Sequence, residues 1–293
     1  MYEQVSKLHQ MMADVRFSKA PTDTLKVYCI TSGKGGVGKT NISVNIALAM
    51  QAAGKKVLLI DADLGLANVD IITGIHSKQN IFHLLQSKRA LEDILIKGQM
   101  GVMILPGASG LYELANLSTF QLSALIESFD KLKNDFDYIL IDTGAGLSKS
   151  VISFIQASDE VIVVTTPEPS SVTDAYAIIK LVHKHFDHVN LIVNRVANFR
   201  EANNTVDKLI RATKRFLNAN VLYLGYVLED KSVKNSNMKQ IPFYVNYPNG
   251  LASKCITNIT NQILNTGPKQ KQDGGHTVVK WFKKLLNMMK NEV

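Results

Sequence analysis

The sequence is poor in cysteine, which limits what can hold the fold together. Only two cysteines occur in 293 residues, Cys29 in an apolar strand pattern and Cys255 in a late helical pattern. Two cysteines so far apart in sequence provide neither a disulfide framework nor a pair of metal ligands. They fit a chain that folds in a reducing cytosol, and they argue against an iron–sulfur carrier, which needs paired cysteines.

The sequence also lacks an apolar run long enough to span a bilayer, and we expect no N-terminal signal peptide. Acidic residues number 25 against 33 lysines and arginines, a formal net charge of +8. This excess is uneven, because residues 266–293 contain six lysines and two acidic residues. A basic tail of this kind indicates an anionic surface, either a membrane or a nucleic acid.

What the chain has in quantity is apolar sequence in short runs. Hydrophobic residues make up 46% of the chain, enough for one sizeable core. Strand and helix patterns alternate, which predicts an α/β fold with a doubly wound, mostly parallel sheet flanked by helices. Strands are expected at residues 27–30, 57–60, 102–105, 138–141, 160–165, 189–194 and 221–227. Helices are expected at residues 42–53, 79–96, 122–132, 148–157, 171–185, 201–217 and 249–265.

The stretch between the first strand and the first helix carries a phosphate-binding pattern. It reads GKGGVGKT and matches G-x-x-x-x-G-K-[ST] at every fixed position. The glycines let backbone N–H groups turn toward phosphate oxygens, and the following helix points its positive end at the same anion. Lys39 is expected to reach the phosphates of ATP, and the Thr40 hydroxyl to bind Mg²⁺. The residues expected to bind the nucleotide here are Gly33, Lys34, Gly35, Gly36, Val37, Gly38, Lys39 and Thr40.

Two further strands end in aspartates. Asp61 and Asp63 follow strand 57–60, and Asp142 follows strand 138–141. In a doubly wound sheet, ligands bind at the carboxyl ends of the strands. One carboxylate of the first pair can hold a magnesium-bound water while the other orients the attacking water, and Asp142 can bind Mg²⁺ through water. A role in a helix cap or a turn stays open for Asp61 and for Asp63.

Later strand ends offer a site for the adenine base. Asn194 ends strand 189–194, where its amide could read the adenine edge, although a turn asparagine is the alternative. Asp230 lies in the loop after strand 221–227, and this loop is expected to lie beside the adenine base.

Helix 201–217 carries a basic face, which we interpret as solvated, with DNA contact as the alternative. Its members are Lys208, Arg211, Lys214 and Arg215.

The last segment, residues 278–291, has an amphipathic helical pattern after a polar linker. Large apolar residues occupy one half of the helical wheel and lysines the other, which is typical of a helix lying in a membrane interface. A helix docked on the protein's own core is the alternative, and the linker and lysines argue against it. The residues expected to meet the membrane are Trp281, Phe282, Leu285, Leu286, Met289, Lys280, Lys283 and Lys284.

By its motifs the sequence resembles the MinD/ParA class of P-loop ATPases over roughly residues 25–265. The motifs are GKGGVGKT, DADLGLANVD and DTGAG, together with Asn194 and GYVLEDKSVKNSNMKQIPF. Within that class it is most similar to the FlhG family, also called YlxH or FleN, which controls flagellar number and placement. Three features favour that family over MinD. They are the motif IDTGAG, which lacks the proline usual in MinD, the stretch LPGASGLYELANLS, and the N-terminal arm of residues 1–24.

The resemblance implies a homodimer formed around two ATP molecules. Lys34 would then be the signature lysine that reaches the partner's phosphates, although a solvated loop lysine is the alternative. Asp63 would orient water, and Asp61 and Asp142 would act in the outer shell of Mg²⁺. The arm carries EQVSKLH at residues 3–9, which partly matches a motif that activates an FlhF-like GTPase. The arm could instead dock on its own domain.

We therefore expect a cytoplasmic ATPase that hydrolyses ATP with Mg²⁺ and attaches reversibly to the anionic inner face of the cell membrane. The expected organisation is a partner-binding arm at 1–24, an ATPase domain at 25–265, a linker at 266–277 and a membrane helix at 278–293. Flagellar basal-body or regulatory proteins are the expected partners. The alternatives are a MinD-type division-site regulator and a ParA-type DNA-segregation ATPase, although DNA binding is the less favoured.

Overall fold

The computed structural model describes residues 25–63, 68–75, 91–106, 132, 135–266 and 278–290. The arm of residues 1–24 and nearly all of the helix expected at 122–132 lie outside these ranges. Within them, no helix combines the length and the apolar character that crossing a bilayer requires.

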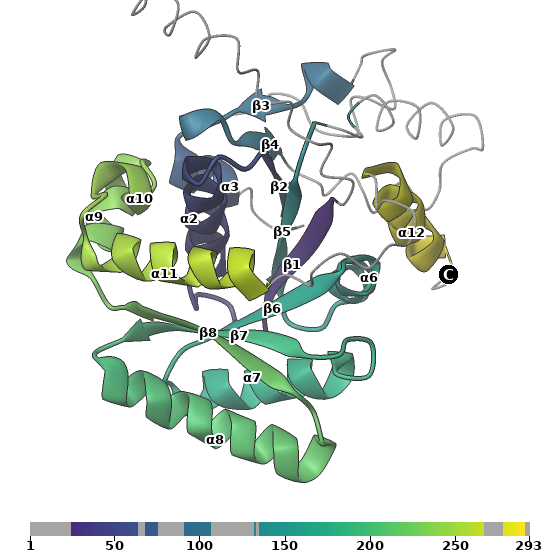
Figure 1. The fold of residues 1–293 in the computed structure, drawn as a ribbon, viewed down its shortest axis with the longest axis vertical. Coiled ribbons are helices and arrows are strands. Elements are labelled where there is room, and N and C mark those ends of the chain that lie inside the picture. The colour runs from purple at the N-terminus through teal and green to yellow at the C-terminus, as the bar shows by residue number, and fades with distance from the viewer. Residues whose placement is uncertain are drawn as a thin grey trace, which may run out of the picture.

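Among the described residues, eight strands form one sheet in the order β3-β4-β2-β5-β1-β6-β7-β8 (Figure 1). Neighbouring strands pair in parallel except β3, which pairs antiparallel with β4. The doubly wound, mostly parallel sheet expected from the sequence is therefore confirmed. The strands are β1 (Lys26–Ser32), β2 (Val57–Ala62), β3 (Ile96–Lys97), β4 (Met103–Leu105), β5 (Tyr138–Ala145), β6 (Glu160–Thr165), β7 (Val189–Val196) and β8 (Val221–Leu228).

Helices cover both faces of the sheet (Figure 1). One apolar core lies under α2, α3, α10 and α11, and the other under α6, α7, α8 and α12. The helices are α2 (Lys39–Ala52), α3 (Asn68–Thr73), α6 (Lys149–Ala157), α7 (Pro169–Val182), α8 (Phe199–Leu217), α9 (Lys231–Lys239), α10 (Phe243–Asn246), α11 (Leu251–Thr266) and α12 (Val278–Lys290). Two short 3-10 turns are η1 (Leu91–Asp93) and η2 (Gln99–Gly101).

The central strands contribute to both cores because alternate residues of a strand point to opposite faces. In β1, Val27 and Cys29 belong to the core beside α6, whereas Tyr28 and Ile30 belong to the core beside α2. A strand buried on both faces must be apolar throughout. For this reason these strands are recognisable as continuous apolar runs in the sequence.

The strand register brings the predicted polar residues to one edge of the sheet. Asp61 of β2 lies opposite Asp142 of β5, and Ile30 of β1 lies opposite Asp142 on the other side. The loop that follows β1 therefore leaves the sheet at the same carboxyl edge as both aspartates, where ligands bind in sheets of this kind.

The expected helix at 79–96 is wrong over its last residues. Residues 91–93 form η1, and Ile96–Lys97 form β3, which pairs with β4 at the edge of the sheet. Leu91 and Ile94 are buried in the core beside α6. Their spacing suits a helix as well as a turn, and the pairing with β4 decides between them.

The C-terminal helix α12 packs on the protein's own core, which corrects the expectation that its apolar face is free to meet a membrane. Trp281 is 3% exposed, and Val278, Phe282 and Leu285 are fully buried. All four belong to the core beside α6, and Figure 1 shows α12 next to that helix. An amphipathic pattern shows that a helix needs an apolar surface but not which surface covers it.

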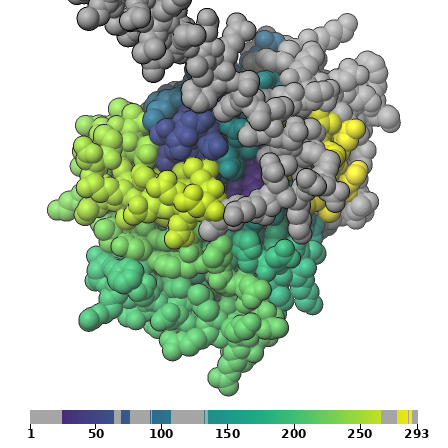
Figure 2. Space-filling view, viewed as in Figure 1, coloured from purple at the N-terminus to yellow at the C-terminus, as the bar shows by residue number. Residues whose placement is uncertain are grey.

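The lysines of α12 differ in their surroundings. Lys280 and Lys283 are exposed, and Figure 2 shows the yellow atoms of α12 reaching the molecular surface. Lys284 is half-buried, with its Nζ 3.4 Å from the carbonyl of Ser158, and burial lowers its pKa. The side chains of Leu286 and Met289 lie outside the described residues.

Candidate nucleotide-binding site

The loop between β1 and α2 has the backbone shape of a phosphate cradle. β1 ends at Ser32 and α2 begins at Lys39. Gly36 and Gly38 have φ angles of 79° and 87°, in the left-handed region that favours glycine. Gly38 is the N-cap of α2, so the N–H groups and the positive end of the helix face the loop.

Two of the loop glycines have neighbours that leave no room for a side chain. A Cβ at Gly33 would overlap the backbone of Asp174 in α7, and a Cβ at Gly38 would overlap the amide nitrogen of Asn194. That amide donates a 2.7 Å hydrogen bond to the carbonyl of Val37. Packing therefore requires glycine at both fixed positions of the motif, and at Gly38 the backbone conformation requires it as well.

A buried cluster joins α2 to β5 beside the loop. Lys39 Nζ donates to Asp142 Oδ1 at 2.9 Å, with the two side chains 7% and 0% exposed. The hydroxyl of Ser43 lies 2.8 Å from the same carboxylate oxygen. The other oxygen, Asp142 Oδ2, is buried and has no hydrogen-bond partner among the described residues. An unpartnered buried acceptor is costly, so this oxygen is available to a cation or its bound water.

Asp61 lies on the neighbouring strand and is also fully buried. Its two oxygens accept backbone hydrogen bonds from Asp63 at 3.2 Å and from Val69 at 3.3 Å. Burial, and secondarily the nearby Asp142, raise the pKa of Asp61 to about 7. Two buried carboxylates at one sheet edge repel each other, and a divalent cation would relieve that repulsion.

Asp63 and Thr40 complete the oxygen donors at this edge. Asp63 is half-buried, and its Oδ1 lies 3.5 Å from the position where a Cβ of Gly144 would be. Thr143, before that glycine, fixes the turn by donating to the carbonyl of Ile30 at 3.1 Å. Thr40 is half-buried in the first turn of α2. Hydroxyl and carboxylate oxygens are the ligands that Mg²⁺ prefers, so the residues fit this ion.

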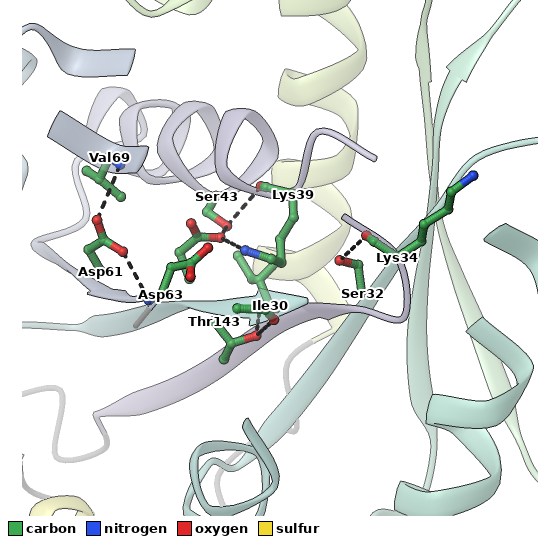
Figure 3. A network of polar contacts seen from close by, with 11 residues as sticks. Ile30, Ser32, Lys34, Lys39, Ser43, Asp61, Asp63, Val69 and Thr143 are labelled. Atoms are coloured by element: carbon green, nitrogen blue, oxygen red, sulfur yellow. Dashed lines mark hydrogen bonds and ion pairs between the residues drawn. The ribbon is translucent and has the colours of Figure 1, made fainter. Parts of the chain in front are cut away.

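Lys34 points away from this cluster (Figure 3). Its Nζ donates to Glu168 at 2.8 Å and to Ser170 at 3.0 Å. Glu168 is the N-cap of α7 and Ser170 lies in its first turn. Gly35, next to Lys34 at the tip of the loop, is exposed. In this single chain Lys34 is therefore held by its own α7, on the outside of the phosphate loop.

Comparisons with known proteins place this site in a family. A family model described as "AAA domain" matches residues 25–194. The antiactivator FleN of Pseudomonas aeruginosa is 38% identical, over 86% of this chain and 90% of FleN. The flagellum site-determining protein YlxH of Helicobacter pylori is 36% identical, over 99% of this chain and 100% of YlxH. The chain belongs to the FleN/YlxH family of MinD/ParA-class ATPases.

A solved structure extends the likeness to the arrangement of the sheet. The septum site-determining protein MinD of Pyrococcus horikoshii, solved in complex with Mg-ADP, superposes with a TM-score of 0.65 at 26% identity. The match covers 82% of this chain and 96% of that protein. The family resemblance read from the sequence motifs is thereby confirmed.

The structure gives other uses to the two residues expected at the adenine base. The Asn194 amide is already bonded to the phosphate loop. The Asp230 carboxylate accepts hydrogen bonds from the backbone of Ser232 at 2.8 Å and of Ala252 at 3.2 Å, so it caps α9 and also contacts the start of α11. Despite the opposing effect of burial, these backbone bonds lower the pKa of Asp230. An adenine contact by either residue stays a prediction for this FleN/YlxH family member.

The basic face of α8 is exposed as expected. Lys208, Arg211, Lys214 and Arg215 all lie at the surface. Among the described residues none of the four forms a salt bridge to an acidic side chain. Arg215 lies over the ring of the neighbouring Phe216, 5.3 Å from its centroid.

Sequence reasoning missed three residues that bond to the predicted site residues of this FleN/YlxH family member. Ser43 carries no motif, and only its position one turn after Lys39 could have suggested that both side chains face Asp142. Glu168 and Ser170 follow a strand on the far side of the loop. The proximity of Glu168 to Lys34 can be inferred only when β1 and β6 are known to pair.

Proposed function

We propose that this chain is an ATP-hydrolysing spatial regulator that controls flagellar number and placement. The observation that carries this proposal is the buried Lys39–Asp142 pair below a glycine cradle, in a chain of the FleN/YlxH family. The name of one of these relatives, the flagellum site-determining protein YlxH, supports the cellular role.

Binding of ATP would exchange the partner of Lys39. In the structure, its ammonium group forms an ion pair with Asp142. Phosphates in the cradle offer more negative charge within reach of the same flexible side chain, so Lys39 would turn from Asp142 to the phosphates. That movement would leave the Ser43 hydroxyl as the donor to Asp142 Oδ1 among the described residues, with Oδ2 available on the cation side.

Mg²⁺, when bound, would neutralise charge on the β- and γ-phosphates. Thr40 would hold the ion directly, and Asp61 and Asp142 would hold it through water. Asp63 lies beside Gly144 at the mouth of this edge and would orient the attacking water by accepting its proton in a hydrogen bond. The backbone at 144–146, next to Asp63, would contact the γ-phosphate.

Dimerisation would exchange the partners of Lys34. The lysine is 40% exposed and bound to an exposed carboxylate, and such a pair contributes little in water. The phosphates of a second subunit would be a stronger partner, so Lys34 would leave Glu168 and Ser170 when two ATP-bound chains meet. A cation supplied in this way stabilises the transition state only after assembly.

Membrane attachment would follow from release of α12. The apolar residues Trp281, Phe282 and Leu285 are the ones proposed to enter the membrane, and they cannot do so while they fill the core. Lys280, Lys283 and Lys284 would then meet anionic headgroups. Two helices on one dimer bind more tightly than one, because the second binds at high effective concentration. The partners proposed are an FlhF-like GTPase for the arm and flagellar basal-body or regulatory proteins.

The catalytic part is tested by Asp63→Ala. The variant should bind ATP and dimerise like the wild type, because orienting water matters only in the transition state. Its turnover, measured by phosphate release, should fall by roughly 10²–10⁴-fold. Asp207→Ala, which removes an exposed carboxylate from α8, is the control. Normal turnover in Asp63→Ala would assign this residue to the loop structure instead.

A ParA-type DNA-segregation role is the second candidate, favoured by the exposed basic face of α8. Co-sedimentation with anionic liposomes and with duplex DNA, each with and without ATP, separates the two proposals. Binding to liposomes only with ATP supports the membrane-attached regulator. ATP-dependent DNA binding that is lost in a Lys208, Arg211 double alanine variant would favour the second candidate.

A further inference from the structure

The side chain of Ser43 lies between two groups of the proposed site. It is fully buried on α2, one turn after Lys39. Its Oγ is 2.8 Å from Asp142 Oδ1 and 3.1 Å from the carbonyl of Lys39. A serine hydroxyl has a single proton, so it can donate to one of these oxygens at a time. The carboxylate is the closer and the charged acceptor, which makes it the stronger partner.

The hydrogen bonds of Asp142 are divided unequally between its oxygens. Lys39 and Ser43 both donate to Oδ1, whereas Oδ2 is buried without a partner among the described residues. Two donors on one oxygen fix the rotation of a carboxylate. The free oxygen is thereby held in one direction rather than sampling several.

We propose that Ser43 is a positioning residue for magnesium: it keeps Asp142 in place when Lys39 leaves for the phosphates. The inference rests on the proposed nucleotide binding. After the exchange, Ser43 is the only one of the two donors that stays on Oδ1. Oδ2 then remains directed toward the ion's bound water. Without the hydroxyl, the carboxylate can rotate or follow Lys39, and the metal loses an outer partner.

The alternative is a purely local role, in which the hydroxyl bonds the carbonyl one turn earlier, as buried serines in helices often do. The two roles differ in what they change. A local role affects the stability of α2 and the affinity for nucleotide with or without metal. A positioning role affects the part of the affinity that Mg²⁺ adds.

The test measures binding of ADP with a fluorescent ribose label, once with EDTA and once with Mg²⁺, so that no turnover is involved. We expect Ser43→Ala to bind the labelled ADP within about twofold of wild type in EDTA. Its apparent affinity for Mg²⁺, taken from a metal titration of the ADP complex, should fall roughly tenfold. Thr205→Ala, which removes a buried hydroxyl bonded to a backbone carbonyl in α8, is the control and should keep the wild-type titration.

Ser43→Thr and Ser43→Val form a second, matched pair, because they have nearly the same shape and differ in the hydroxyl. The Ser43→Thr variant should bind Mg²⁺ several-fold more tightly than the Ser43→Val variant, even if the added methyl group lowers the melting temperature of both. An unchanged magnesium titration in Ser43→Ala overturns the inference, and so does an equal loss of affinity with and without metal. If wild type binds labelled ADP in neither condition, the proposed function fails first, and the role of Ser43 fails with it.

Discussion

Lys34 has bonding partners in its own chain before it meets a second chain. Its bonds to Glu168 and Ser170 must break before the lysine can reach across a dimer. Glu168 is exposed, and its hydrogen bond and ion pair with Lys34 lower its pKa, so it carries its charge at neutral pH. The cis contact therefore competes directly with the proposed trans contact.

Glu168→Gln should make dimerisation easier. The variant removes the competing charge, so half-maximal dimer formation should need roughly two- to fivefold less ATP than in wild type. Light scattering across an ATP titration measures this. Glu229→Gln is the matched control, because Glu229 forms a similarly exposed 2.9 Å ion pair with Arg195. A dimer midpoint that moves to higher ATP would mean that Glu168 supports the dimer instead of competing with it.

Asp61 gives the nucleotide-free protein a stability that depends on pH. Its pKa is about 7 in the folded chain and about 3.9 when unfolded. The contribution of Asp61 is therefore fully present below pH 4 and is lost as pH rises toward 7. Without nucleotide, the melting temperature of Asp61→Asn should fall less than that of wild type between pH 5 and pH 8. Asp207→Asn serves as the exposed control, and parallel curves for Asp61→Asn and wild type would contradict the assignment.

At the scale of the element, α12 has an inner side in the core and an outer side in solvent. A substitution such as Phe282→Glu would disturb both docking and membrane binding, because it would place a charge where the side chain is fully buried. A substitution at the exposed Lys283 distinguishes membrane binding from docking. Reversing its charge leaves the buried side untouched.

Lys283→Glu should therefore weaken ATP-dependent sedimentation with anionic liposomes while leaving the melting temperature within about 1 °C. A lysine near an anionic surface contributes ~1 kcal/mol. Reversal on both helices of a dimer should thus lower liposome affinity at least tenfold. Lys254→Glu, at an exposed position of α11, controls for net charge. Equal binding by Lys283→Glu and wild type would exclude α12 as the membrane contact.

Elements were predictable from the sequence where local pattern and environment agree. The buried strands β1, β2 and β5 and the helices α2 and α6 are continuous apolar or amphipathic runs, so their positions were recognisable. The helix α3, which follows β2, was not among the expected helices. β3 was not, because a two-residue strand such as Ile96–Lys97 exists only through its pairing with β4. The docking of α12 was missed for a related reason: its cover is supplied by residues distant in sequence.

The whole molecule explains why motif residues were found and their supporting residues were not. Lys39, Asp61 and Asp142 lie at fixed offsets from strand ends, and the parallel sheet necessarily gathers those ends. The contacts of Asn194 with Val37 and of Asp230 with Ala252 depend on packing across the fold. Sequence offsets carry no information about them, so their expected adenine role rested on strand-end position alone.

At this scale the arm should be separable from the fold. β1 begins at Lys26 in the middle of the sheet, and Leu25 just before it is already buried. Deleting residues 1–24 should leave the melting temperature within about 2 °C and basal ATP turnover within about twofold. The deletion should abolish stimulation of an FlhF-like GTPase, measured as GTP hydrolysis with and without the variant. An insoluble or unfolded product would assign the arm to the core.

The single tryptophan of the chain lies in the interface between α12 and the core. Trp281 is 3% exposed there, and its indole N–H has no hydrogen-bond partner among the described residues. Its fluorescence emission therefore comes from one dry environment and should shift to longer wavelength when the helix meets water. The protein thus contains its own optical probe: emission spectra recorded during an ATP titration would report release of the helix without any label.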